Sequence, residues 1–372
     1  MTSITYVGLD VHTTNYTAAC YRFDTDNTFA VATLKPKADE IVKYLNKVKN
    51  GLGEDCEFVC GYEAGCLGYS LYHELTAKGI NCVIMAPSTM ETAPANKIKT
   101  DKRDAVKIAK CLAKGSYKSV HVPTDEDNAV KEYIRMRDDV KDALKRLKQQ
   151  IVAFCIRNGK IFKNVVGKNY WTNKHLKWLK SLEFSHTVLK DTLDEYLILF
   201  YVLCEKIDSY DMKIEELSRL PRFEEPVKKL CCFTGVATHT AMAVISEISD
   251  FARFPDAKSF SAYLGLVPGE HSSSDKRHQL SITKQGNTHI RRLLVESAQS
   301  YTKGITVKKS AALKKRQAGM PSNVIAYADK CTERLKKKFI RVALRSSHNL
   351  AKTAVARELS CFIWGMMTEN YG

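Results

Sequence analysis

The sequence predicts an α/β region at the N-terminus, followed by a region that is mostly α-helical. Two observations predict this division. Short β-rich runs are confined to about the first 120 residues, and apolar residues recur at helical or heptad spacing after residue 125. The chain has 372 residues, of which 44% are hydrophobic, so it can form more than one core. We therefore expect an α/β domain at 1–120, a helical coiled-coil segment at 121–226 and a mostly helical domain at 227–372.

The N-terminal domain opens with three short β-rich runs, which polar turns separate and which predict an antiparallel meander. Helices and strands then alternate. The strands are expected at 4–11, 16–23, 28–34, 57–61 and 80–85, and the helices at about 38–50, 67–78 and 101–114. Three hairpin-linked strands followed by alternating units imply a mixed sheet with helices on both faces, an order that resembles the ribonuclease-H-like fold.

The central segment carries two heptad patterns, over 140–154 and about 187–218. Two such helices predict either an antiparallel hairpin or a coiled coil between subunits. Residues 156–184 between them are basic and aromatic and show no clear period. We expect Pro221 and Pro226 to close this segment at a domain boundary.

The last third is predicted to be helical around one loop. An apolar helix is expected within 231–250, and a loop with HSSSDKRHQ at its centre spans about 267–287. Helices at about 288–303, 322–345 and 349–368 complete the chain.

Charge and composition narrow the functional classes. The chain carries 58 Lys and Arg against 41 Asp and Glu, a formal net charge of +17, and most of the excess lies in residues 231–372. This concentration is typical of a domain that faces a polyanion, with a solubilising charged surface as the alternative. No apolar run is long enough to span a membrane, and the first residues lack a signal-peptide pattern, so we expect a cytoplasmic protein with no membrane partner.

The twelve cysteines do not predict a disulfide scaffold, because the chain is long and rich in core residues. No CxxC pair occurs, and the spacing closest to a metal site, Cys56, Cys60 and Cys66, falls on a strand and the turn after it. We expect buried, reduced thiols.

Four carboxylates are placed to meet at one edge of the predicted sheet. Asp10 ends the first strand, Glu63 follows the fourth, and Asp101 and Asp104 share one face at the start of a helix. Converging carboxylates repel one another unless cations hold them, and two Mg²⁺ ions are the usual apparatus for phosphodiester displacement. The alternative for Asp101 and Asp104 is that they favour the positive end of the helix dipole.

A serine triplet, Ser272 to Ser274, forms the second candidate site. A serine hydroxyl is a poor nucleophile unless it is activated, and the basic residues around the triplet would position a phosphate and stabilise its transition state. From composition alone, a flexible linker is the alternative. The surrounding basic residues are Lys276, Arg277, Lys284, Arg291 and Arg292.

Six segments together resemble the DEDD-type insertion-sequence transposases, the bridge-RNA-guided serine recombinases that are related to the Piv-type DNA invertases. The similarity runs over nearly the whole chain in the same motif order. The segments are YVGLDVH (6–12), GYEAG (61–65), IKTDKRDA (98–105), LGLVPGEHSS (264–273), TKQGNTHIRRLL (283–294) and AVARELSCFIWGMM (354–367).

The resemblance implies an N-terminal domain like the junction resolvase RuvC, with a DEDD quartet at Asp10, Glu63, Asp101 and Asp104. It also implies a C-terminal transposase domain whose serine forms a transient phosphoserine link to DNA. The spacing of the family's loop places that nucleophile at Ser273. This chain departs from the pattern because Ser274 replaces a glycine and Ser272 also precedes the position, so Ser272 stays a candidate.

The resemblance also implies the partners: target and donor DNA, a noncoding bridge RNA that pairs with both, and a homo-tetramer built as a dimer of dimers. Such a protein needs diffuse positive charge rather than base-reading helices. Tryptophans 171 and 178 could stack on bases or pack in a core. The expected nucleic-acid contacts are Lys102, Arg103, Lys276, Arg277, Lys284, Arg291, Arg292, Lys314, Lys315 and Arg316.

We expect a recombinase that needs no nucleotide triphosphate, and the sequence contains no GxxxxGK[ST] loop. Two alternatives remain open. A metal-dependent nuclease or Holliday-junction resolvase would need the carboxylates but none of the serines, and a non-catalytic nucleic-acid-binding relative would need neither.

Overall fold

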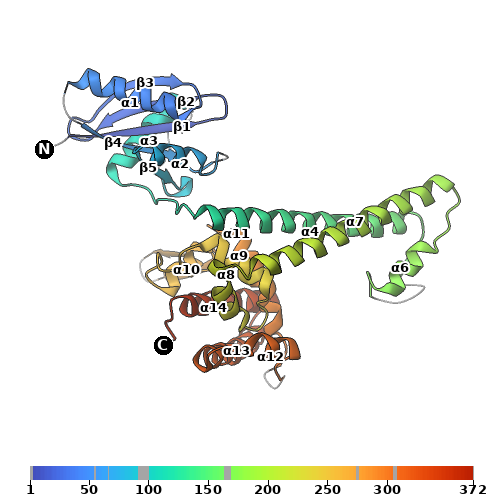
Figure 1. The fold of residues 1–372 in the computed structure, drawn as a ribbon. Helices are drawn as coiled ribbons and strands as arrows, with labels where there is room; N and C mark the ends of the chain where they lie inside the picture. Colours follow the sequence, from blue (N-terminus) through green and yellow to red (C-terminus); the bar gives the residue numbers. More distant parts are fainter. Residues whose placement is uncertain are drawn as a thin grey trace. The chain divides into compact units, whose positions relative to one another are not determined.

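A computed structural model of the protein describes residues 3–53, 56–65, 67–90, 100–162, 169–273, 276–304 and 308–371. The chain forms two compact units, Met1–Val122 and Pro123–Gly372 (Figure 1). The division lies next to the predicted end of the first domain at residue 120. The predicted further boundary at 226 falls inside the second unit and stays a prediction.

One mixed sheet organises the first unit. Its strand order is β3-β2-β1-β4-β5. β1 pairs antiparallel with β2, and β2 with β3, whereas β4 lies parallel to β1 and β5 parallel to β4. The predicted meander and mixed sheet are therefore confirmed. The strands are β1 (Ser3–Val11), β2 (Tyr16–Arg22), β3 (Asn27–Leu34), β4 (Cys56–Glu63) and β5 (Asn81–Met85).

Helices cover both faces of this sheet, as predicted. α1 (Ala38–Leu52) and α2 (Ser70–Ala77) share one apolar cluster with Val7 and Leu9 of β1. α3 (Asp101–Lys114) covers the other face. Successive side chains of a strand point to opposite faces, so one alternate set contacts α1 and the other set contacts α3. This is the period-two pattern of a strand that is buried on both sides.

The close approach of α3 to β1 depends on a glycine. A Cβ atom at Gly8 would lie 2.0 Å from the Ala105 carbonyl oxygen and 2.4 Å from the Ala109 nitrogen. Thr100 caps the start of α3 by accepting a hydrogen bond from the Arg103 backbone N–H, and Gly115 ends the helix in the left-handed conformation. Local sequence therefore sets both ends of α3, and the glycine sets its distance from the sheet.

Two long helices, α4 (Asp125–Arg157) and α7 (Thr187–Leu217), pair with each other in the second unit and form an arm (Figure 1). Of the two predicted arrangements, the structure shows the antiparallel hairpin within one chain. The sequence missed a short helix between them, α6 (Asn173–Lys180). Trp171 stacks on Phe200 with ring centroids 5.2 Å apart, and Trp178 lies 5.1 Å from Phe162, so both tryptophans pack within the arm.

The remaining helices surround a second large core, which also includes Ile134 of α4 and Ile214 of α7. The sequence missed two short helices, α10 and α12. The helices are α8 (Pro221–Cys231), α9 (Thr238–Ile248), α10 (Ala257–Tyr263), α11 (Thr288–Ser297), α12 (Ala311–Gln317), α13 (Ser322–Ala343) and α14 (His348–Met367), with a 3-10 turn at Ala298–Tyr301. A second 3-10 turn, Pro87–Thr89, belongs to the first unit.

The long helix α7 ends at Leu217, close to the predicted end of the heptad segment at 218 and before Pro221, and the domain boundary expected at Pro221 and Pro226 stays a prediction. Pro221 occupies the first turn of α8, where the missing N–H costs nothing, and Pro226 lies inside the helix. Phe223, Val227 and Leu230 of α8 are buried in the core, and this apolar face holds the helix together across Pro226.

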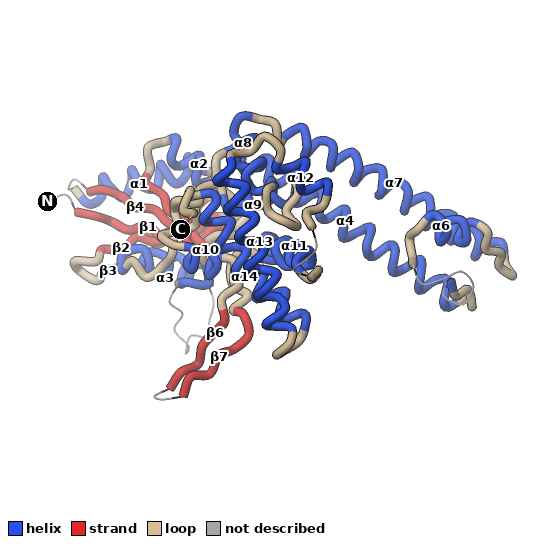
Figure 2. Tube along the Cα trace, turned by 90° about the horizontal axis from the view of Figure 1, so that it is seen from below, coloured by secondary structure: helices blue, strands red, loops and turns tan. Residues whose placement is uncertain are grey.

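The predicted loop at 267–287 contains a β-hairpin, formed by β6 (Pro268–Ser273) and β7 (Lys276–Ile282). The two strands project from the helices of their unit (Figure 2). The sequence did not predict the strands because most of their residues are polar, so no apolar alternation marks them.

Every described cysteine is a free thiol, and most are buried, as predicted. Cys66 lies outside the described residues. Within the described part of the chain, no helix combines the length and apolar character that a membrane span requires.

Candidate active site

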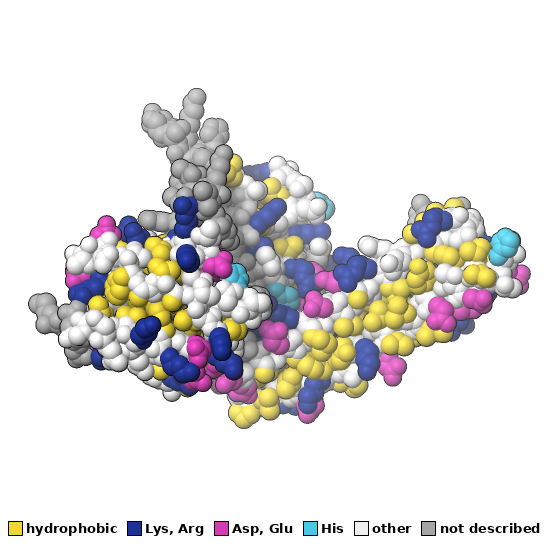
Figure 3. All heavy atoms as spheres, turned by 90° about the horizontal axis from the view of Figure 1, so that it is seen from above, with side chains coloured by type: hydrophobic (Ala, Val, Ile, Leu, Met, Phe, Trp, Pro, Cys, Tyr) yellow, Lys and Arg dark blue, Asp and Glu magenta, His cyan; other side chains and the backbone are white. Residues whose placement is uncertain are grey.

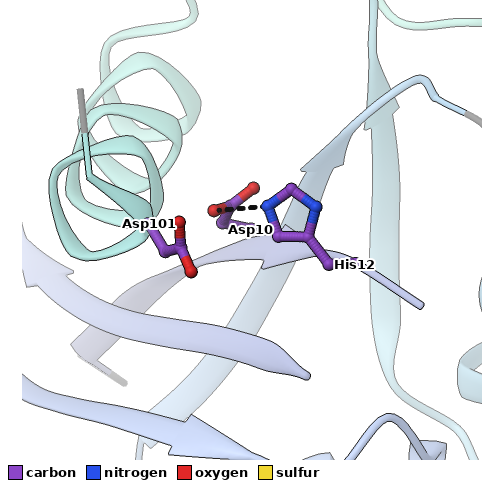
Figure 4. A group of neighbouring side chains, drawn as sticks. All are labelled: Asp10, His12 and Asp101. Atoms are coloured by element: carbon purple, nitrogen blue, oxygen red, sulfur yellow. Dashed lines mark ion pairs between the residues drawn. The ribbon is translucent and has the colours of Figure 1, made fainter. Parts of the chain in front are cut away.

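Asp10, His12 and Asp101 form a cluster at the end of β1 (Figure 4). One ligand atom from each side chain lies within 4.8 Å of the others. Asp10 is the penultimate residue of β1, and Asp101 is the first residue of α3. The structure therefore brings together two of the four predicted carboxylates, and the close packing of α3 on Gly8 holds their elements in place.

The sequence analysis missed His12, whose Nε2 lies 3.3 Å from Asp10 Oδ2. The sequence offered a signal, because His12 follows Asp10 by two residues, the spacing that places residues on one face of a strand, although β1 ends one residue before His12. His12 is half-exposed, so solvent reaches one side of the cluster.

The Asp10 carboxylate is only 16% exposed, and its Oδ2 atom, which faces His12, is buried. Burial raises the pKa of Asp10, His12 opposes that increase, and the negative charges of Asp101 and Asp104 raise it further. A largely buried carboxylate beside a second carboxylate and an imidazole fits a divalent cation with hard oxygen ligands.

The other two predicted carboxylates lie beside this cluster. Asp104 is one turn along α3 from Asp101, and its charge acts on Asp10. Glu63 is the last residue of β4, and the pairing of Leu9 with Tyr62 places it opposite Asp10 in the register. A Cβ atom at Gly61 would face Leu112 of α3, so Glu63, two residues on, lies on the same face of the sheet. Within the described residues, the group with ligand atoms inside 4.8 Å contains neither Glu63 nor Asp104.

The candidate serines lie on the hairpin of the second unit. In its register Ser272 pairs with Arg277, and Ser273 pairs with Lys276. The backbone thus places a basic residue directly opposite each serine. Ser274 lies outside the described residues, and the side chains of 271–279 are not described.

The base of the hairpin is tightly fixed. Cβ atoms at Gly265 and Gly286 would lie 2.1 Å from the Gln285 oxygen and 1.9 Å from the Tyr263 oxygen, and both glycines have positive φ angles. Arg291 Nη1 donates to the carbonyl oxygens of Leu264 and Gln285 at 2.8 and 3.2 Å. The predicted phosphate ligand Arg291 is therefore engaged in holding the loop closed.

The remaining predicted nucleic-acid contacts fall into two groups. Arg292 donates to Asp138 at 2.8 Å, and Arg316 donates to the Cys231 carbonyl oxygen at 3.0 Å. The others with described side chains are exposed, and their contact with nucleic acid stays a prediction. These exposed residues are Lys102, Arg103, Lys284, Lys314 and Lys315.

Two family profiles match this chain, one over the region of the carboxylate cluster and one over the region of the serine hairpin. Residues 227–313 match the profile described as "Transposase IS116/IS110/IS902 family", and residues 7–155 match the DEDD transposase profile of IS110. The chain is 31% identical to y4qE of Sinorhizobium fredii over 309 residues, which are 83% of this chain and 75% of that protein. It is 27% identical to the transposase for IS1111A of Coxiella burnetii over 70% of this chain and 71% of that protein.

The transposase for insertion sequence element IS1533 of Leptospira borgpetersenii is 32% identical to this chain over 336 residues. These residues are 90% of this chain and 95% of that protein. Identity at this level over nearly the whole of both proteins, together with the two profile matches, shows that the chain belongs to the IS110/IS116/IS902 family of insertion-sequence transposases.

Proposed function

We propose that this transposase cuts and rejoins DNA through a Mg²⁺-dependent carboxylate site on a ribonuclease-H-like, RuvC-like domain and a serine nucleophile on the hairpin of the second unit. The observation that carries the proposal is the cluster itself, in which ligand atoms of the largely buried Asp10 carboxylate, of Asp101 and of His12 lie within 4.8 Å of one another. The strand order β3-β2-β1-β4-β5, with β3, β2 and β1 antiparallel, supports the fold assignment.

Asp10 and Asp101 would hold the metal, with Asp104 and Glu63 completing the quartet around a pair of ions. When bound, Mg²⁺ would supply positive charge to a phosphodiester that accumulates negative charge during displacement. The chain itself positions these ligands. α3 orients Asp101 and Asp104, and the ends of the neighbouring strands β1 and β4 present Asp10 and Glu63.

Ser273 would attack the phosphorus of a DNA phosphodiester, forming a serine–phosphate bond and breaking the bond to one deoxyribose oxygen. The bond energy is then kept in the phosphoserine, so rejoining needs no nucleotide triphosphate. Lys276 and Arg277 stand opposite the serines in the register, and their positive charge would stabilise the negative charge that builds up on the attacked phosphate.

A bridge RNA would choose the DNA sites, and the exposed lysines named above would contact the phosphate backbone of either nucleic acid. Assembly as a dimer of dimers would use the arm. Apolar side chains are exposed along the paired helices of the arm (Figure 3), among them Val188, Ile198, Leu199, Val202 and Met212 of α7. Exposed apolar side chains in such a row are typical of a surface that binds another protein.

An adduct assay tests the chemistry. The protein is incubated with its flanking noncoding RNA, Mg²⁺ and DNA carrying the element junction, and the products are separated on a denaturing gel and mapped by peptide mass. We expect a DNA adduct on Ser273 that is lost in Ser273→Ala and in Asp10→Asn but kept in Ser272→Ala. An adduct that survives Ser273→Ala and is lost in Ser272→Ala would move the nucleophile to Ser272.

A second function is a metal-dependent nuclease or Holliday-junction resolvase. It is favoured by one observation, that all three residues of the described cluster, Asp10, His12 and Asp101, belong to the first unit. In the same assay, a nuclease would give cleaved DNA with no adduct, and the Ser273→Ala protein would cleave as well as the unmodified protein.

A further inference from the structure

A network of buried charges lies at the junction of the arm, the helical core and the hairpin. Its centres are two carboxylates, Asp138 on α4 and Glu247 on α9, whose side chains are 5% and 4% exposed. Carboxylates this deeply buried are rare unless cations surround them.

Asp138 meets four cationic or imidazole groups. Arg137 Nη1 lies 2.9 Å from Oδ1, and Arg292 Nη2 donates to Oδ2 at 2.8 Å. His239 Nε2 lies 2.9 Å from Oδ1, and His289 Nε2 lies 2.7 Å from Oδ2. Although burial opposes the charge, these partners hold the pKa of Asp138 well below its usual range.

Glu247 is bound by groups from two other elements. Arg135 of α4 donates twice, at 2.6 and 3.0 Å, and Asn287 Nδ2 donates at 2.8 Å. His289 Nδ1 lies 3.1 Å from Glu247 Oε1. Both ring nitrogens of His289 thus face carboxylates, so a doubly protonated ring satisfies both contacts.

The network reaches the hairpin through Asn287, the N-cap residue of α11, and His289 in the first turn of that helix, which five residues connect to the end of β7. Asn287 caps α11 by accepting from the Ile290 N–H, and its own N–H donates to the Tyr263 carbonyl oxygen beside Gly286. In the other direction, Arg137 donates to both carboxylate oxygens of Asp211 on α7, each at 2.8 Å. One chain of short polar contacts therefore joins both helices of the arm to the base of the hairpin.

We propose that Asp138, His289 and Glu247 are positioning residues that fix the serine hairpin relative to the arm helices. A polar network has a defined geometry at each contact, whereas an apolar contact of the same size tolerates sliding. The effect of this positioning on catalysis rests on the proposed function, since it requires a serine of the hairpin to react with DNA. The immobilisation of the hairpin does not depend on the proposed function.

Two conservative variants and a matched control test the proposal in the full-length chain. Glu247→Gln keeps the size of the side chain and removes its charge, and Arg135→Lys keeps the charge and removes the paired contact. The control is Asp127→Asn, because Asp127 also lies on α4, is fully buried and pairs with Arg222 at 3.0 Å and with Ser249, away from the hairpin. Hydrogen–deuterium exchange of the backbone amides at 268–273 and 276–282 measures how firmly the hairpin is held.

We expect both network variants to speed hairpin exchange, Glu247→Gln by about tenfold or more, while Asp127→Asn leaves it unchanged. Formation of the serine adduct should slow by a similar factor at saturating DNA, with DNA affinity unchanged. If hairpin exchange responds equally to Asp127→Asn, or does not respond to either network variant, the proposal is overturned. If hairpin exchange responds as expected but neither the unmodified protein nor any variant forms an adduct, the proposed serine chemistry fails and the positioning role stands.

Discussion

The two carboxylate clusters of this transposase are opposites. Asp138 and Glu247 are surrounded by arginine, histidine and asparagine donors from the chain itself, and the pKa of Glu247 falls to about 2. Asp10 is partly buried, it has one imidazole and two carboxylates as neighbours, and its pKa is raised. Burial opposes the charged form in both places, so the sign of the pKa shift is decided by the cations that the chain provides. A buried carboxylate whose charge the chain's own cations do not balance is a candidate metal ligand. A compensated carboxylate, whose charge they do balance, is a candidate structural residue.

The largest effect expected from this contrast is on activity. Asp10→Asn should reduce DNA cleavage by at least about 10³-fold, because in the proposed site it would remove a negative ligand of the metal. Without metal, the same change should leave the melting temperature unchanged or raise it, since it relieves repulsion from Asp101 and Asp104. Cleavage assays and thermal unfolding measure the two effects, with the exposed Asp24→Asn as the control. A variant that keeps full cleavage would remove Asp10 from the active site.

The corresponding change in the compensated cluster should act on stability. Asp138→Asn leaves buried arginine and histidine groups without their counter-charge and should lower the free energy of unfolding of the second unit by about 3–5 kcal/mol. Urea unfolding measures this. Asp142→Asn is the control, because Asp142 lies on the same helix, is half-exposed and is 3.9 Å from Arg292. Equal losses in the two variants would show that the buried network contributes no special stability.

The compensated cluster should also give the second unit a limited pH range of greatest stability. The pKa of Glu247 is lowered from 4.5 to about 2, so its contribution is complete above pH 4.5 and is lost as the pH falls toward 2. The pKa of His289 is raised from 6.5 to about 9; burial lowers it, but its hydrogen bonds to Asp138 and Glu247 outweigh burial. Its contribution is complete below pH 6.5 and is lost as the pH rises to 9.

Urea midpoints measured from pH 3 to pH 10 should therefore be highest between about pH 4.5 and 6.5. His289→Gln should flatten the alkaline side of the profile and leave the acid side, which depends on Glu247. Unchanged alkaline behaviour in His289→Gln would contradict a charged His289 between the two carboxylates.

The smallest expected effect concerns His12, whose imidazole lies beside Asp10. His12→Gln should weaken Mn²⁺ binding to the metal-free protein by about tenfold, since an imidazole next to a ligand either joins the metal or orients the ligand. Paramagnetic resonance titration of free Mn²⁺ gives the affinity, with the exposed His73→Gln on α2 as the control. Equal Mn²⁺ affinity in the two variants would show that His12 takes no part in metal binding.

Local patterns predicted the parts of the candidate site that depend on neighbours in sequence. The start of α3 at Asp101 follows from Thr100 as the cap, and Asp10 stands out as a charge at the end of an apolar strand. His12 could have been found by the same period-two argument. The hairpin could not, because its strands are held by backbone pairing and carry few apolar residues.

Local sequence patterns could not predict the charge network, for a different reason. Asp138 and His289 are 151 residues apart in sequence, and Asp138 stands in a run of charged residues that resembles a solvated helix face. For the same reason, Arg292 reads as a phosphate ligand in the sequence, although its guanidinium donates to Asp138 in the folded chain. Only tertiary structure shows which charges face solvent and which face each other.

The contact between Gly8 and α3 has a consequence for how this family can vary. Main-chain atoms of a helix and a strand touch there, so the gap between Asp10 and Asp101 is set by backbone and is independent of the side chains around it. Substitutions elsewhere on α3 can accumulate without changing the spacing of the carboxylates. A single methyl group at position 8 would push the helix away and separate them, disabling the enzyme while every charged residue stays in place.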